Sequence, residues 1–231
     1  MQSKSTLSVT EAIESRMSCR AFLPTPVPAA TIRAILESAK RAPSGGNLQP
    51  WHVYALAGPP LQEFLTIIRG KLAAQPRGEA PEYDIYPKNI TEPYRTRRFK
   101  CGEDMYATLN IPREDKPARL QHFARNYALF GAPACLFFAI DRQMGVGQWA
   151  DLGMFMQNIM LLACEHGLDT CAQEAWAVWH KTIEEFLGIP PHLMLFCGMA
   201  VGYRDPAAPI NTLRTERAAL EEFTTLRGWN E

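Results

Sequence analysis

The chain has 231 residues, 47% of them hydrophobic, which is enough to bury a sizeable core in one large domain or two small ones. Lysine plus arginine equals aspartate plus glutamate at 24 each, so no overall charge would attract nucleic acid or an anionic membrane. No apolar run approaches the ~20 residues that span a bilayer, and no apolar signal region opens the chain. The six cysteines form no C-x-x-C pair, so we expect neither disulfides nor zinc, and a cytoplasmic location.

The first half of the chain predicts helices around one strand. A short helix is expected over 10–16 with Thr10 as its cap, and a longer one over 28–41, ended by Pro43. Residues 51–57 alternate as a strand does, and a helix follows from the Pro59-Pro60 pair to about Leu72. From 75 to about 116 the pattern dissolves into mixed charges, prolines and aromatics, and such a long irregular stretch is usually functional or mobile.

The second half predicts a buried strand over 134–140 and a helix over 149–166 that Gly167 stops. That helix is apolar on nearly every face, so it must lie at the centre of the domain or in a subunit interface. A short extended segment, a helix and a last strand are expected over 170–177, 181–187 and 194–203. This order of elements indicates an α+β or α/β domain built on one sheet. The apolar helix and the polar tail from Arg204 together indicate a dimer.

Two short runs carry most of the functional signal. Arg16, Ser18 and Arg20 supply two guanidinium groups and a hydroxyl, which suit a phosphate. The run Ser44-Gly45-Gly46-Asn47, followed by Gln-Pro-Trp, lets backbone N–H groups approach something flat and polar. Each run alone is equally typical of a solvated helix end or an ordinary turn. Together with a second basic pair, Arg214 and Arg217, they predict a pocket for a phosphorylated, planar cofactor.

Other kinds of site find little support. The chain has no G-x-x-x-x-G-K-[ST] loop and no G-x-G-x-x-G after a strand. Its five histidines are dispersed without H-E-x-x-H spacing, and no G-x-S-x-G elbow is present, so neither a metal centre nor a side-chain nucleophile is expected. If the protein is an enzyme, a cofactor carries the reactive atoms.

In chain order, these motifs resemble the FMN-dependent nitroreductase family over nearly the whole length. They are Arg16-x-Ser18-x-Arg20, Ala42-Pro-Ser-Gly-Gly-Asn47-x-Gln49-Pro-Trp51, the Gln157-Asn158 helix with Gly167-Leu168, Val201-Gly202-Tyr203 and Arg214-Thr-Glu-Arg217. The resemblance implies an α+β, three-layer fold, in which helices flank a mixed, mainly antiparallel sheet, and an intertwined homodimer with two FMN molecules at its interface. It implies one domain over 1–231, with 75–125 as a variable substrate lid and 204–231 as a dimer-wrapping tail.

The resemblance also assigns the site residue by residue. Arg16, Ser18 and Arg20 would hold the FMN phosphate, with Arg217 and Arg214 closing over it. Pro43, Ser44 and Asn47 would meet the flavin from the partner subunit, and Ala172, Gln173 and Glu174 would lie beside its reactive N5 edge. The chain departs from the family pattern at Thr215, where a lysine is common, and at Ala172 and Ala175, where proline and glycine are common.

The implied activity is ping-pong hydride transfer from NADH or NADPH, through tightly bound FMN, to a small planar aromatic acceptor. A nitroaromatic such as a nitrobenzoate is the first choice, and quinones follow. Arg95, Arg97, Arg98 and Lys100 would pair with an acidic substituent or face solvent. The same fold leaves open a reductive dehalogenase or a flavin-fragmenting protein, and a non-catalytic flavin-binding or sensor protein is the alternative from another class. Neither nucleic acid nor a membrane is expected as a partner.

Overall fold

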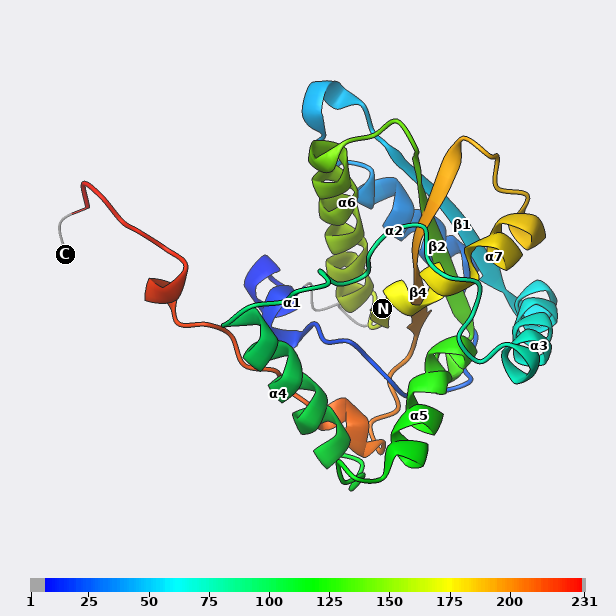
Figure 1. Cartoon of the computed structure of the whole chain (residues 1–231). Coiled ribbons are helices and arrows are strands. Elements are labelled where there is room, and N and C mark those ends of the chain that lie inside the picture. The colour runs from blue at the N-terminus through cyan, green and yellow to red at the C-terminus, as the bar shows by residue number, and fades with distance from the viewer. Residues whose placement is uncertain (1–6, 230–231) are drawn as a thin grey trace, which may run out of the picture.

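The computed structural model describes residues 7–229. Its four strands form one antiparallel sheet in the order β1-β2-β4-β3 (Figure 1), with β1 at Trp51–Ala57, β2 at Ala134–Asp141, β3 at Asp169–Gln173 and β4 at Leu193–Gly202. β2 and β4 are central and almost wholly buried, because helices cover both faces of the sheet. The α+β fold is confirmed. The strands are antiparallel throughout rather than mixed, and within residues 7–229 the parallel pairing is an isolated bridge between Ser18 and Thr170.

The sheet separates two helical layers. On one face lie α2 (Ala29–Ala39) and α6 (Val146–Glu165), with α1 (Val9–Ser15) packed against α6. On the other face lie α3 (Gly58–Ala74), α7 (His180–Leu187) and the 3-10 turns that follow β3 and α5 (Lys116–Ala124). α4 (Tyr94–Ala107) buries no residue and stands away from the sheet (Figure 1).

Successive residues of β2 point to opposite faces and thereby build two cores. Phe137 packs against Phe64 of α3 and Trp176, with ring centroids 5.4 and 5.5 Å away. Phe138 faces Phe155 of α6 at 6.4 Å. Because burial of one such side chain contributes about 1.5–3 kcal/mol, the two cores hold α3 and α6 on opposite faces of the same sheet.

Three boundaries differ from the sequence expectation. The cap of α1 is Ser8, not Thr10: its hydroxyl accepts from the N–H of Glu11 at 3.2 Å, and the Glu11 carboxylate accepts from the N–H of Ser8 at 2.7 Å. The stretch expected to be irregular contains α4 and the start of α5. The extended segment over 170–177 ends at Gln173 and continues as a 3-10 turn over Glu174–Trp179.

α4 and α5 escaped the sequence analysis because they have no apolar stripe. Their signals are caps and charge pairs. The Glu92 carboxylate accepts from the N–H of Thr96 before α4, and the Asp115 carboxylate accepts from the N–H of Ala118 at the start of α5. A search for apolar residues at helical spacing does not detect such helices.

α6 buries only one side within a single chain. Leu152, Phe155 and Ile159 face the sheet, whereas Ala150 and Met154 on the opposite side are exposed, Met154 by 40%. The burial expected on every side is therefore absent within one chain, and an apolar strip of α6 lies open. Among residues 7–229, no helix combines the length and apolarity needed to cross a bilayer.

Candidate functional site

A cleft of about 540 Å³ opens where α1, α4, the middle of α6 and the C-terminal segment meet. Five of the residues predicted for the phosphate line it, although they come from the two ends of the sequence: Arg16, Ser18, Arg20, Arg214 and Arg217. Glu14 of α1, Cys101 of α4 and Gln157 of α6 are among the other lining residues. The fold thus brings together the two basic clusters that the sequence presents separately.

The spacing of the first cluster follows from extended backbone. Residues 16–21 run beside β3, where side chains alternate between two sides. Met17 and Cys19 are buried in the core, whereas Arg16, Ser18 and Arg20 are only partly buried. The pattern Arg-x-Ser-x-Arg therefore puts two guanidinium groups and a hydroxyl on the open side.

One buried amide joins this segment to the tail. Asn211 accepts a hydrogen bond from the N–H of Arg20 at 2.9 Å and donates to the carbonyls of Ala21 and Asp205 at 2.8 and 3.0 Å. Only two residues separate Asn211 from Arg214. The amide therefore holds the second basic cluster opposite the first.

The four guanidinium groups of the cleft form no ion pair within residues 7–229. Arg20 donates to the carbonyl of Ser18 at 3.2 Å, and Arg217 donates to the carbonyl of Glu216 at 2.8 Å. Four like charges around one space repel each other unless an anion lies between them. Guanidinium forks of this kind match the oxygens of a phosphate group.

Two other titratable groups near the cleft carry little charge. Burial raises the pKa of the Cys19 thiol to about 12, so this cysteine is a core residue and no nucleophile. Burial lowers the pKa of His122, and the charges of Arg125 and Arg20 lower it further. His122 is thus neutral at pH 7, and the lining of the cleft holds four guanidinium groups against one carboxylate, that of Glu14.

The predicted N5 group ends β3. Ser18 bridges to Thr170, and Gln173, the last residue of β3, lies three residues or roughly 10 Å further along the strand, at ~3.3 Å per residue. Ala172 and Glu174 are exposed there, and Gln173 between them is buried.

The buried side chain of Gln173 fixes the turn at this end of β3. Its Nε2 atom donates to the main-chain and side-chain oxygens of Asn126 at 2.9 and 3.1 Å, and its Oε1 atom accepts from the indole N–H of Trp176 at 3.4 Å. The Gln173 side chain is thus committed to the protein. The groups that this turn exposes are its main chain and the residues on either side of Gln173, Ala172 and Glu174.

Pro43, Ser44 and Asn47 lie on the turn between α2 and β1. Asn47 has a left-handed φ of 57°, which asparagine tolerates better than most residues. The N–H of Gly45 donates to the buried Asp151 carboxylate at 3.1 Å and so ties the turn to the N-terminal part of α6.

The turn and the basic cleft meet α6 at different places. The turn is tied to Asp151, whereas the cleft reaches α6 at Gln157 and α1 approaches Cys164, which is close enough for Ser15 and Arg16 to affect the pKa of its thiol. Gln157 and Cys164 follow Asp151 by six and thirteen residues, or roughly 9 and 20 Å of helix. None of residues 43–51 lines the cleft, so a single chain does not bring the two predicted parts of the site together.

A sequence model described as the nitroreductase family matches residues 13–203. The chain belongs to the nitroreductase family. Among similar proteins, the nitrobenzene nitroreductase of Ectopseudomonas oleovorans is 36% identical over 94% of this chain and 96% of its own. The 4-nitrobenzoate reductase of Pseudomonas putida is 35% identical over 94% of this chain and 95% of its own.

Solved structures confirm the nitroreductase fold. The FMN and NADPH-dependent nitroreductase NfnB of Sphigopyxis sp. strain HMH superposes with a TM-score of 0.93 at 44% identity, over 96% of this chain and all of its own. The FMN-dependent nitroreductase NfnB of Mycobacterium smegmatis, solved in complex with NADPH, gives a TM-score of 0.89 at 28% identity, over 94% and 97% of the two chains. These matches bear on the fold and family, and the assignment of individual site residues stays a prediction.

Several residues that position the site were not predicted. Asn211, Asp151 and Asn126 act through one to three hydrogen bonds each, most of them to partners far away in the sequence. A lone asparagine or aspartate gives no periodic or spacing signal, so only the folded chain reveals these roles.

Proposed function

We propose that this nitroreductase-family protein transfers hydride from NADH or NADPH, through bound FMN, to a nitroaromatic acceptor. The observation that carries the proposal is the cleft in which four guanidinium groups without ion-pair partners surround one space. The relatives named above, two of them named for nitroaromatic substrates and two described as FMN-dependent, support the same activity. NADPH is the first choice of donor because both of those structures are described with it. A donor of this kind favours a cytoplasmic location.

The residues of the cleft fit an FMN phosphate. Arg16 and Arg20 would each offer a planar pair of donors, and the Ser18 hydroxyl would donate between them. Arg214 and Arg217 would close over the phosphate from the tail. Thr215 lies between them in the lining, at the position where a lysine is common in the family. The lining thus lacks that lysine but keeps its four arginines.

The turn after β3 would face the reactive edge of the ring. FMN, when bound, supplies the hydride chemistry of both half-reactions. Gln173 would hold the turn rigid through Asn126, so that main-chain N–H groups point at one fixed place. Nicotinamide and acceptor would use the same open side in turn, which makes the kinetics ping-pong.

The complete site would need two chains. In its own chain, the loop with Pro43, Ser44 and Asn47 is tied to α6 at Asp151, and none of its residues lines the cleft that holds the two basic clusters. The open apolar strip of α6 would pack against the partner. Large side chains of the tail are also exposed and would wrap the second chain: Leu220 by 53%, Phe223 by 70%, Leu226 by 65% and Trp229 by 76%. We therefore propose a homodimer in which 204–231 is the wrapping tail and 75–125 is the lid.

The lid offers one candidate cation for an acidic acceptor. Arg95 is paired with Glu92, Arg97 with Glu222, and Lys100 with both Asp104 and Glu216, so three of the four cations expected to bind substrate already have carboxylate partners. Arg98 stacks over the Tyr86 ring at 4.0 Å and forms no ion pair within residues 7–229.

The role of Arg98 has a direct test. If it recognises the carboxylate of a nitrobenzoate, Arg98→Gln raises the KM for 4-nitrobenzoate about 10-fold, the effect of one charge-assisted contact, and leaves the KM for uncharged nitrobenzene unchanged. Arg95→Gln is the matched control on the same helix. Equal effects of Arg98→Gln on both substrates would remove Arg98 from carboxylate recognition.

The proposed function is tested by anaerobic half-reactions on the purified protein. We expect a yellow protein whose flavin absorbance is bleached by NADPH and restored by one addition of nitroarene. Failure of NADPH and NADH to bleach a yellow protein would favour a flavin-binding sensor. Halide release from a halogenated aromatic in place of nitroarene turnover would favour a reductive dehalogenase. A colourless protein that refuses FMN would contradict the proposal entirely.

A further inference from the structure

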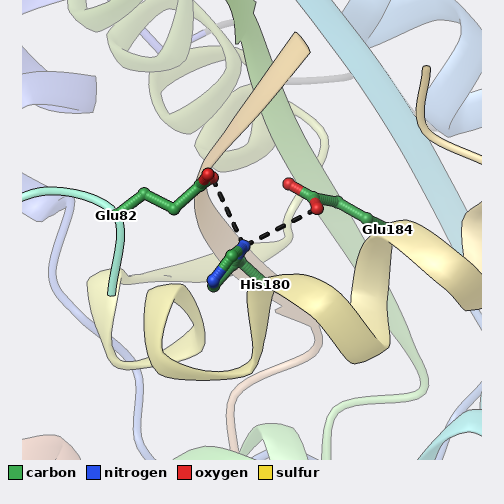
Figure 2. Close-up of side chains that lie close together, drawn as sticks. All are labelled: Glu82, His180 and Glu184. Carbon is green, nitrogen blue, oxygen red and sulfur yellow. Dashed lines mark ion pairs between the residues drawn. The ribbon is translucent and has the colours of Figure 1, made fainter. Parts of the chain in front are cut away.

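A second cluster of polar side chains lies on the far side of the sheet from the cleft. Glu82 comes from the segment between α3 and α4, whereas His180 and Glu184 stand one turn apart on α7 (Figure 2). His180 is 7% exposed, and its Nδ1 atom lies 3.3 Å from Glu82 Oε2 and 3.6 Å from Glu184 Oε2. Arg142, just beyond β2, completes the group.

Both carboxylates lie close to Arg142 and His180. Arg142 Nη1 lies 2.7 Å from Glu82 Oε1, and its Nη2 atom donates to Glu82 Oε2 at 3.3 Å and lies 3.6 Å from Glu184 Oε1. The Oε2 atoms of both glutamates also face His180 Nδ1, which forms no hydrogen bond within residues 7–229. The Nε atom of Arg142 donates to the carbonyl of Pro191 at 2.8 Å, which holds the guanidinium group beside the two carboxylates.

We propose that His180 Nδ1 and the Oε2 atoms of Glu82 and Glu184 bind a divalent transition-metal ion of the zinc class. Nitrogen and oxygen ligands of zinc lie about 2.0–2.2 Å from the metal, and tetrahedral geometry then sets the ligands about 3.3 Å apart. The observed separations from Nδ1 are 3.3 and 3.6 Å. An imidazole ligand also selects zinc, nickel or cobalt over calcium and magnesium, which take oxygen ligands.

The charges favour a cation at this place. Burial raises the pKa of the Glu184 carboxyl, and the neighbouring charge of Glu82 raises it further, even though His180 and Arg142 oppose that rise. A metal ion between the two carboxylates would remove their repulsion. A proton on His180 would do the same, so the metal and the proton compete for one nitrogen, and metal binding weakens as the pH falls.

The metal would fasten the beginning of the lid to the body of the protein. Glu82 belongs to a segment that is already attached nearby: the N–H of Glu79 donates to the carbonyl of Val178 at 2.6 Å, and the Tyr83 hydroxyl donates to the carbonyl of Phe196 at 2.6 Å. The site therefore stabilises the segment that leads into α4, and it is independent of the flavin cleft.

The test uses the full-length FMN-loaded protein, dialysed against a chelator and titrated with Zn²⁺ by calorimetry at pH 7.5 and at a pH near 6. We expect one equivalent bound per chain at the higher pH and weaker binding at the lower. Glu184→Gln and His180→Gln each weaken binding at least ~10 to 100-fold, whereas Glu185→Gln, one residue away and exposed, binds like the parent. Flavin content and melting temperature show whether each variant is folded.

Crystals soaked in Zn²⁺ give a readout that needs no variant. The proposal requires an anomalous peak between His180 Nδ1 and the two glutamates. It is overturned if the soaked crystals show no peak there, or if Glu184→Gln and Glu185→Gln bind Zn²⁺ equally. It is also overturned if the NMR signals of the His180 imidazole do not change when Zn²⁺ is added at pH 7.5. None of these results depends on nitroreductase activity.

Discussion

Asn211 joins the two halves of the basic cleft, and its replacement tests how the cleft is built. Asn211→Ala removes three hydrogen bonds, one to the N–H of Arg20 and two to main-chain carbonyls. Each contributes about 0.5–1.5 kcal/mol net, so the free energy of unfolding of the FMN-free protein should fall by about 3 kcal/mol. Because the amide also positions the arginines of both clusters, FMN affinity should fall at least ~10-fold as well.

Both quantities are accessible on the same samples. Urea unfolding at fixed protein concentration gives the free energy, and quenching of flavin fluorescence during titration gives the FMN dissociation constant. Thr212→Ala is the matched control, because the adjacent Thr212 hydroxyl forms one exposed hydrogen bond to the carbonyl of Pro209. We expect a change within about 0.5 kcal/mol and unaltered FMN affinity for the control. If Asn211→Ala loses stability but binds FMN like the parent, the amide is a core residue that does not position the cleft.

Three further changes test other parts of the account. Arg20→Ala should weaken FMN binding about 10 to 100-fold, the equivalent of one charge-assisted phosphate contact, and unchanged affinity in a fluorescence titration would remove Arg20 from the site. Asp151→Ala leaves the N–H of Gly45 unpaired and should lower kcat/KM for nitroarenes about 10-fold, whereas Asp151→Asn, which keeps an acceptor oxygen, should restore most of it; equal losses would contradict the role of this hydrogen bond. The pKa of His122 is lowered in the folded protein, so its contribution to stability is present above pH 6.5 and is lost as the pH falls through the folded pKa. Unfolding measured at pH 7 and at roughly pH 5 should therefore show a larger loss of stability for the parent than for His122→Gln, and parallel losses would show that His122 does not titrate in this way.

The parts of the site that the sequence predicted well are those where chemistry and local geometry coincide. Arg16, Ser18 and Arg20 occupy alternate positions of an extended segment. Because alternate side chains of extended backbone point to the same side, their spacing predicts that they share one face. β1 was predicted with its observed bounds for the same reason, because alternation over Trp51–Ala57 reflects a half-buried edge strand.

Features that depend on contacts between residues far apart in the chain could not be predicted from the sequence. Asn211 has a positioning role because it forms hydrogen bonds with Arg20 and Ala21, near the other end of the sequence. His180 and Glu184 are four residues apart on one helix, a visible spacing, but Glu82 is contributed by a distant segment, so no metal site was expected. The cations of α4 were predicted to pair with an acidic substituent of the substrate or to face solvent, and two of them, Arg97 and Lys100, pair with carboxylates of the tail that only the folded chain brings near.

The central claim is that one flavin site is built from two chains, with Arg20 from one and the Asn47 loop from the other. Mixing two impaired variants, at an FMN concentration that fills the parent site but not the Arg20→Ala site, measures this directly. Arg20→Ala removes the phosphate contact, and Asn47→Asp keeps the left-handed backbone while adding a charge beside the flavin.

After subunit exchange in the presence of FMN, half of the dimers carry one chain of each kind. If the two residues serve the same site from different chains, each mixed dimer has one intact site, and nitroarene reductase activity returns to about a quarter of the parent value. If both residues serve a site within one chain, every site in the mixed dimer keeps one defect and no activity returns. Absence of recovery, with exchange verified by native mass spectrometry, would contradict the two-chain site.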